Sequence, residues 1–178
     1  MSKNVLSTGK VAFPIEFDDG YKTFIYFRPN DREFWQRIEK FEKSIEEKAN
    51  QIDMEKYKST FDDGIDVNFD IDHPEKIFEM SKEELASLKN KVNAVNSIEE
   101  EHNKVIREEL DVVFDSKISD VAFKYCQPFD IVCVPNEDGT EETMPYILHF
   151  MHWLFVELKK KGIQNDSAMN KYIAKYSK

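Results

Sequence analysis

The chain has 178 residues, of which 40% are hydrophobic and 34% are charged, and its formal net charge is −10. This length and composition suffice for a buried core without disulfides or a structural metal, which argues against wholesale disorder. The acidic balance disfavours direct nucleic-acid binding. The chain has five glycines and no Gly-rich phosphate loop, which excludes the usual nucleotide-binding enzymes. We expect a single domain over residues 1–178.

The N-terminal part of the chain predicts a β-hairpin and a helix. Residues 11–17 and 21–27 are rich in apolar, aromatic and β-branched side chains, with the turn signal Asp18-Asp19-Gly20 between them. Pro14 is expected at a sheet edge or bulge, because proline cannot donate to the ladder. A helix capped by Asn30 should run to about residue 50. Its apolar face consists of Phe34, Ile38, Phe41, Ile45 and Ile52.

The acidic stretch at residues 53–80 allows two interpretations. Apolar residues 65, 67, 69 and 71 alternate with polar ones, which predicts a short strand. The composition equally fits an acidic linker or insertion. A capping box of Ser81 and Glu84 then predicts a long helix that reaches Val113 and packs antiparallel to the first helix.

The C-terminal part predicts mixed structure. Residues 114–123 should form a turn with a short helix, 129–134 a strand between two prolines, and 136–143 an acidic loop. A helix from Pro145 to Lys161 should end at Gly162, and residues 163–178 form a basic tail. The expected fold class is α+β, mostly α. An N-terminal β-hairpin, with or without a third strand, packs against two or three long amphipathic helices.

Two surfaces are candidate binding sites. Tyr146, Phe150 and Trp153 lie on the second side of a helix that is apolar nearly all round, and could bind a protein partner. The other candidate is an acidic patch of five aspartates: Asp62, Asp63, Asp66, Asp70 and Asp72. Asp66, Asp70 and Asp72, with Asn68, have a spacing similar to that of a calcium-binding EF-hand loop. With Asp66 as position one, however, Ile71 and Ile77 occupy the positions that need Gly and Glu. Solvated acidic surface is therefore the favoured interpretation of the patch.

Residue types that could support catalysis or metal binding do not form a recognised pattern. His149 and His152 share a predicted helix, but Cys126 and Cys133 are spaced too widely for a structural zinc site. Adjacent glutamates on charged helices are typical of solvated faces and not of acid–base pairs. We expect a protein that is not an enzyme, with no catalytic residue, cofactor or metal.

The cellular location is inferred from the lack of a secretory signal at residues 1–10 and of an apolar run long enough to span a membrane. The first ten residues lack the apolar core of a secretory signal. The longest apolar run, at residues 146–158, is too short to span a bilayer. We therefore expect a cytoplasmic protein with reduced cysteines and no membrane partner.

Three segments carry a family resemblance: residues 26–34 (YFRPNDREF), 110–123 (LDVVFDSKISDVAF) and 171–176 (KYIAKY). With these, the chain resembles the small tail-assembly chaperone-like proteins of siphophages and of prophages in Gram-positive hosts. The family has the pattern Asp-x-x-Phe-Gly-x-Gly where this chain has residues 111–117. Asp115 and Lys117 stand here in place of the two glycines.

The resemblance implies a phage protein in the host cytoplasm that binds the tape-measure protein, keeps its apolar helices soluble and recruits tail-tube proteins. The family has no catalytic residues to carry over. The charge suggests an alternative, a phage-encoded acidic inhibitor that mimics nucleic acid and blocks a host defence nuclease, as an anti-CRISPR protein does. A chaperone should bind through apolar surface with weak salt dependence, whereas binding of a nucleic-acid mimic should weaken steeply with salt.

Overall fold

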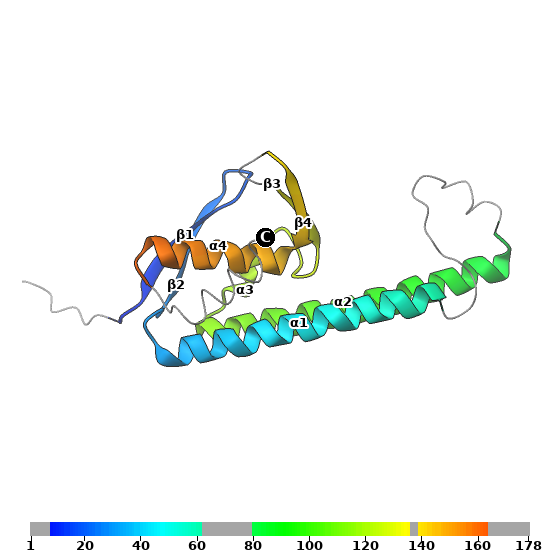
Figure 1. Cartoon of the computed structure of the whole chain (residues 1–178), viewed down its shortest axis with the longest axis horizontal. Coiled ribbons are helices and arrows are strands. Elements are labelled where there is room, and N and C mark those ends of the chain that lie inside the picture. Colours follow the sequence, from blue (N-terminus) through cyan, green and yellow to red (C-terminus); the bar gives the residue numbers. More distant parts are fainter. Residues whose placement is uncertain (1–7, 62–79, 136–138, 164–178) are drawn as a thin grey trace, which may run out of the picture. The chain divides into compact units, whose positions relative to one another are not determined.

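The computed structural model describes residues 8–61, 80–135 and 139–163. The elements in chain order are β1 Val11–Glu16, β2 Lys22–Phe27, α1 Arg32–Phe61, α2 Lys82–Phe114, α3 Ser119–Ala122, β3 Ile131–Pro135, β4 Glu141–Pro145 and α4 Tyr146–Lys160 (Figure 1). The protein is a mixed α and β structure that is mostly helical, with an N-terminal antiparallel hairpin followed by long helices. This confirms the expected fold class.

The chain divides into two compact units. The first unit comprises Met1–Lys43 and Ile106–Lys178, and the second comprises Ser44–Val105. The long helices α1 and α2 each contribute to both units. The expectation of a single domain stays a prediction.

The hairpin β1–β2 places one face in the core of the first unit. Its antiparallel register runs from Val11 opposite Phe27 to Glu16 opposite Lys22. Because side chains alternate across a strand, the inward positions Phe13, Ile15, Ile25 and Phe27 are all buried. Gly20 has φ of 82° at the turn, a left-handed conformation that glycine adopts without steric cost.

Aromatic rings and α4 build the core of the first unit. The Phe27 ring lies 4.5 Å from that of Phe13, 5.0 Å from Phe34 and 4.7 Å from Phe114, measured between centroids. This cluster joins the hairpin to the start of α1 and the end of α2. One face of α4 is fully buried beside it, formed by Ile147, Met151, Leu154 and Leu158.

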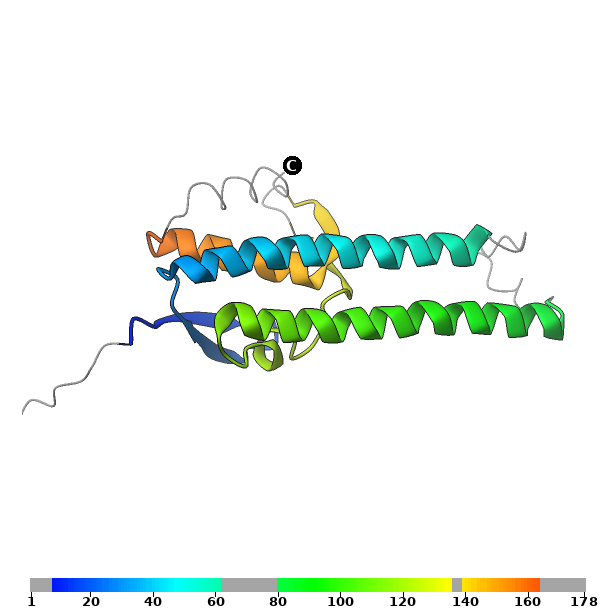
Figure 2. The ribbon, with the colours of Figure 1, turned by 90° about the horizontal axis from the view of Figure 1, so that it is seen from below.

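The second unit consists of the later part of α1 and the earlier part of α2, which run antiparallel to each other (Figure 2). Ile45 and Ile52 of α1 are buried here. The apolar stripe of α2 is less covered, since Leu85 is 38% and Val92 is 45% exposed. The predicted capping box begins α2. The Ser81 N–H donates to Glu84 Oε2 at 2.7 Å, and the Glu84 N–H donates to Ser81 Oγ at 3.2 Å.

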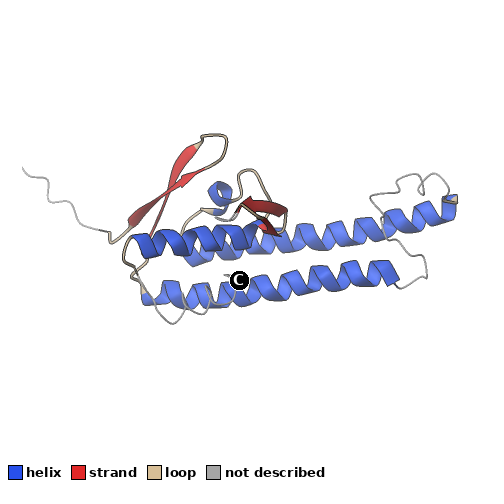
Figure 3. Cartoon of the chain, turned by 45° about the horizontal axis from the view of Figure 1, so that its top comes forward, coloured by secondary structure: helices blue, strands red, loops and turns tan. Residues whose placement is uncertain are grey.

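The structure corrects two expectations about element bounds. Helix α1 continues to Phe61 instead of ending near residue 50, and Ile52 is buried within this added length. The strand expected at 129–134 is β3, and it does not join the first hairpin. It pairs with β4 in a second two-stranded sheet, from Ile131 opposite Pro145 to Pro135 opposite Glu141 (Figure 3). Residues 141–143, expected in a loop, therefore belong to a strand.

Several expectations fall outside the described residues. These are residues 62–79 of the acidic strand or linker expected at 53–80, and the basic tail from residue 164 onward. Residues 53–61 of that expected linker belong to α1. The helix expected from Pro145 to Lys161 is confirmed as α4, which begins at Tyr146 because Pro145 ends β4, and Gly162 follows it with φ of 67°.

Candidate functional site

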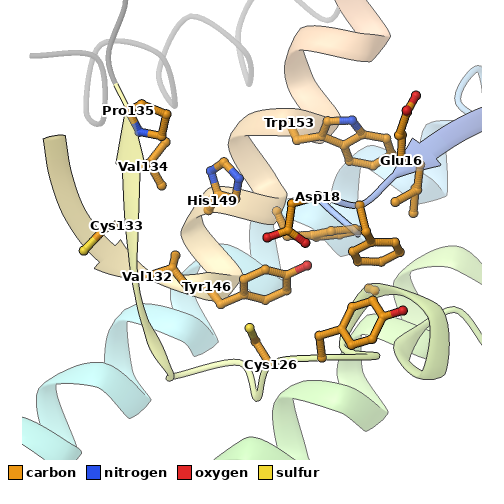
Figure 4. Close-up of a pocket in the computed structure, with 15 residues that line it drawn as sticks. Glu16, Asp18, Cys126, Val132, Cys133, Val134, Pro135, Tyr146, His149 and Trp153 are labelled. Carbon is orange, nitrogen blue, oxygen red and sulfur yellow. The ribbon is translucent and has the colours of Figure 1, made fainter. Parts of the chain in front are cut away.

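A cavity of about 450 Å³ lies within the first unit, between the tip of hairpin β1–β2, the segment after α3, strand β3 and helix α4 (Figure 4). We call it the α4 groove. Its lining is mainly apolar and aromatic, and consists of Ile15, Glu16, Phe17, Asp18, Ala122, Tyr125, Cys126, Val132, Cys133, Val134, Pro135, Tyr146, His149, Phe150 and Trp153.

Helix α4 supplies four of the lining residues. These residues share one face of the helix, because His149, Phe150 and Trp153 follow Tyr146 by three, four and seven positions. Phe150 is buried, with 5% of its surface exposed, whereas Tyr146 and Trp153 are half-buried. The three residues singled out in the sequence thus line one cavity. Their role in partner binding stays a prediction, and Phe150 is largely inaccessible from outside.

Backbone hydrogen bonds fix the start of α4. The Tyr146 N–H donates to the Asp130 carbonyl and the Ile147 N–H donates to the Pro128 carbonyl, both at 2.8 Å. These bonds satisfy two of the amide groups that a helix leaves free at its N-terminus. They therefore hold Tyr146 at a set position in the groove.

A cluster of contacts fixes the opposite wall, which we call the hairpin-tip cluster (Phe17, Asp19, Tyr21, Lys124 and Tyr125). The Tyr125 hydroxyl donates to the Asp19 carboxylate. The Lys124 ammonium lies 3.2 Å from the ring centroid of Tyr21, and the rings of Phe17 and Tyr125 meet edge to face at 5.1 Å. Hydrogen bonding from Tyr125, and then from the Tyr21 N–H, lowers the pKa of Asp19. Together these contacts join the hairpin tip to the segment that carries Cys126.

Three titratable groups in the groove, Tyr146, Cys126 and His149, have pKa values shifted toward the uncharged form. Burial, with smaller effects from Cys126 and Asp18, raises the pKa of Tyr146 to about 12. Burial, with the charges of Asp130 and Asp18, also raises the pKa of the Cys126 thiol. Burial and nearby His152 lower the pKa of His149. A protonated thiol is a poor nucleophile, so this arrangement suits binding better than covalent chemistry.

The residues considered for metal binding do not come together. Cys126, Cys133 and His149 line the groove, but His152 is not among its lining residues. Across the described ranges, no three or more His, Cys, Asp or Glu side chains are grouped so that they could hold a metal ion. Both cysteines are free thiols.

The second candidate surface cannot be placed. The five aspartates of the acidic patch all lie outside the described residues: Asp62, Asp63, Asp66, Asp70 and Asp72.

None of the described helices has the length and apolarity needed to cross a bilayer.

The sequence did not point to most of the groove residues as members of a site, among them Asp18, Tyr125, Val132 and Val134. The Asp18-Asp19-Gly20 signal marked a turn, and residues 129–134 marked a strand, but neither signal says which distant segment lies alongside. Only the tertiary fold brings these segments to α4.

Comparison of the chain with protein-family models, curated proteins and solved structures finds no match.

Proposed function

We propose that this protein is a phage tail-assembly chaperone-like protein, which binds an apolar segment of the tape-measure protein in the α4 groove and also recruits tail-tube proteins. The observation that supports binding is the groove itself, whose lining is mainly apolar and which has half-buried Tyr146 and Trp153 side chains. The phage assignment rests on the sequence resemblance at residues 26–34 and 110–123.

The size and chemistry of the groove support a binding role. Its volume of about 450 Å³ falls within the range of about 300–1,000 Å³ that is typical of ligand pockets. Aromatic and aliphatic walls favour an apolar occupant, since burial contributes about 25 cal/mol for each Å² removed from water. The raised pKa values of Tyr146 and Cys126 favour their protonated forms, which are poor nucleophiles.

The backbone at the end of α2 supports the family resemblance. Asp115, which stands where the family pattern has its first glycine, has φ of 49°. Its N–H donates to the Val112 carbonyl at 3.3 Å, and the Ser116 N–H donates to the Asp111 carbonyl at 3.1 Å. This pair of bonds is a Schellman motif, which favours glycine at the left-handed position. The departure at Asp115 therefore occurs at a position whose conformation still suits the glycine of the family.

An affinity purification tests the proposal. The tagged full chain is expressed in cells that produce the phage, washed at high salt, and the co-purifying proteins are identified by mass spectrometry. We expect a tape-measure or tail-tube protein that is retained at high salt. Trp153→Ala should reduce its recovery about tenfold, equivalent to about 1.4 kcal/mol.

Val156→Ala is the matched control, because Val156 is on the same helix, is 37% exposed and does not line the groove. Failure to recover a tail protein, or recovery that Trp153→Ala leaves unchanged, would contradict the proposal. Recovery of a host nuclease that is lost at high salt would favour the acidic inhibitor instead.

A further inference from the structure

The α4 groove carries negative charge that nothing in its lining neutralises. Glu16 and Asp18 are its charged lining residues, and no Lys or Arg is among the described residues that line it. Glu16 already pairs with Lys22 at 2.8 Å. No hydrogen bond or ion pair joins the Asp18 carboxylate to any other residue in the described ranges.

The basic side chain of the hairpin-tip cluster, Lys124, is already engaged. Lys124 lies over the Tyr21 ring at 3.2 Å and over the Tyr125 ring at 4.8 Å. Asp19, the neighbour of Asp18, accepts a hydrogen bond from Tyr125. The turn therefore presents one engaged carboxylate and one free carboxylate, and the free one lines the groove (Figure 4).

Two half-buried groups respond to this charge. After burial, the negative charge of Asp18 contributes to raising the pKa of both the Cys126 thiol and the Tyr146 hydroxyl. Asp130 acts on Cys126 in the same direction. A negative potential has this effect because it disfavours a second negative charge. The same potential favours a cation.

Aromatic rings surround the region in which a cation would lie. Tyr146, Phe150 and Trp153 project from one face of α4, and the Phe150 and Trp153 rings are 5.5 Å apart. Aromatic faces attract ammonium and guanidinium groups, and they also cover the aliphatic stems of Lys and Arg. The groove thus combines an apolar wall for a stem with a carboxylate for a charged head.

We propose that the α4 groove selects a protein segment in which a Lys or Arg is flanked by apolar residues, and that Asp18 pairs with the basic group. The inference rests on the proposed function, because the occupant is taken to be a segment of a partner protein. Charge complementarity disfavours acidic peptides and nucleic acids as occupants.

The test starts from a displayed library of random peptides, which are selected for binding to the full-length chain. Peptides that also bind the Trp153→Ala variant are removed, so that only binders that depend on the groove remain. Enriched peptides are synthesised with a fluorophore, each paired with a version in which the basic residue is Met. Fluorescence polarisation then gives the dissociation constants. We expect enrichment of Lys or Arg beside apolar residues.

Asp18→Asn should weaken these peptides about three- to fivefold, the range for a partly exposed ion pair. Asp120→Asn is the control, since Asp120 is exposed on α3 and does not line the groove. In the Asp18→Asn protein, changing the peptide's basic residue to Met should weaken binding less than it does in the unaltered protein, because the ion pair is already lost. This double-variant comparison isolates the charge pair even if Asp18→Asn alters the turn.

The outcomes separate the two proposals. Groove-dependent peptides without Lys or Arg, or peptides indifferent to Asp18→Asn, overturn the selectivity inference and leave the proposed function standing. If no selected peptide depends on Trp153, the groove does not bind protein segments and both proposals fail.

Discussion

Phe24 and Phe27 lie on the same strand, β2, and differ in solvent exposure. Phe27 is 1% exposed within the aromatic cluster of the first unit, whereas Phe24 is 54% exposed on the outer face of the hairpin. Phe27→Ala should lower the free energy of unfolding by about 3–5 kcal/mol, because it opens a cavity. Phe24→Ala should change it by about 0.5 kcal/mol or less. Urea unfolding of both variants measures the difference, and equal costs would contradict the assigned faces of β2.

His102 should make stability depend on pH. Its Nε2 atom is buried without a hydrogen-bond partner, and burial, followed by the charge of Lys48, lowers its pKa from 6.5. The unfolded chain therefore binds this proton at a higher pH than the folded chain does. Stability should fall as the pH drops below about 6.5, with the loss complete once the pH is below the folded-state value.

His102→Leu should flatten this part of the pH profile, as measured by urea midpoints between about pH 7 and pH 5. His149, whose pKa is also lowered, contributes with the same sign and retains its effect in this variant. An unchanged pH profile in His102→Leu would show that His102 is not desolvated as described.

Residue burial was partly predictable from periodicity. The alternation of apolar residues in 11–17 places Phe13 and Ile15 on the same side of the strand, and both are buried. Residues 21–27 are apolar or aromatic on both sides, so their composition predicts a strand without separating buried Phe27 from exposed Phe24. The same method gives less for α4, because a helix that is apolar nearly all round has no polar side to orient it. The sequence therefore could not separate buried Phe150 from half-buried Trp153.

At the scale of the element, the end of α2 is the most testable feature. Asp115 takes a left-handed conformation in a Schellman motif, which costs energy for a residue with a Cβ atom. Asp115→Gly should therefore raise the free energy of unfolding by about 1 kcal/mol. Asp120→Gly, at an exposed position within α3, should lower it by a similar amount, about 0.5–1 kcal/mol. Destabilisation by both changes would contradict the motif.

The second hairpin shows why some elements escape sequence reasoning. Residues 141–143 are Glu-Glu-Thr and all exposed, so they carry no alternation that predicts a strand. They become β4 because β3 offers a partner in register. Helix α2 was predictable because its capping box at Ser81 forms as the sequence indicates. The apolar period of α1 predicted buried Ile45 and Ile52, but its cap is Asp31, which accepts from the Glu33 N–H, and not the expected Asn30.

At the scale of the whole molecule, the two units differ in how much apolar surface they bury. In the described part of the second unit the buried hydrophobic residues are Ile45 and Ile52, and the remaining buried hydrophobic residues belong to the first unit. Regions with few buried apolar contacts open at lower free energy. Native-state hydrogen exchange should therefore be faster in residues 82–105 of α2 than in residues 106–114 of the same helix. Equal protection along α2 would contradict this difference.

The groove depends on the tertiary fold, because its lining comes from four segments that are far apart in sequence: residues 15–18, 122–126, 132–135 and 146–153. The sequence identified the α4 residues as a candidate surface from local pattern alone. It could not identify Asp18 or Val132 as their neighbours, since this depends on long-range packing. The prediction therefore named three residues that line the cavity, and it gave neither the cavity nor its charge.

Protein binding at the α4 groove is the central claim, and the two tryptophans allow a direct measurement. Trp153 lines the groove, whereas Trp35 is buried and its indole N–H donates to the Pro29 carbonyl at 2.9 Å. The tape-measure segment recovered with the chain is titrated into protein that carries isotope-labelled tryptophan, and the two indole signals are followed by NMR. We predict that the Trp153 signal shifts to saturation while the Trp35 signal stays in place. Saturable binding that leaves the Trp153 signal unmoved would contradict the account.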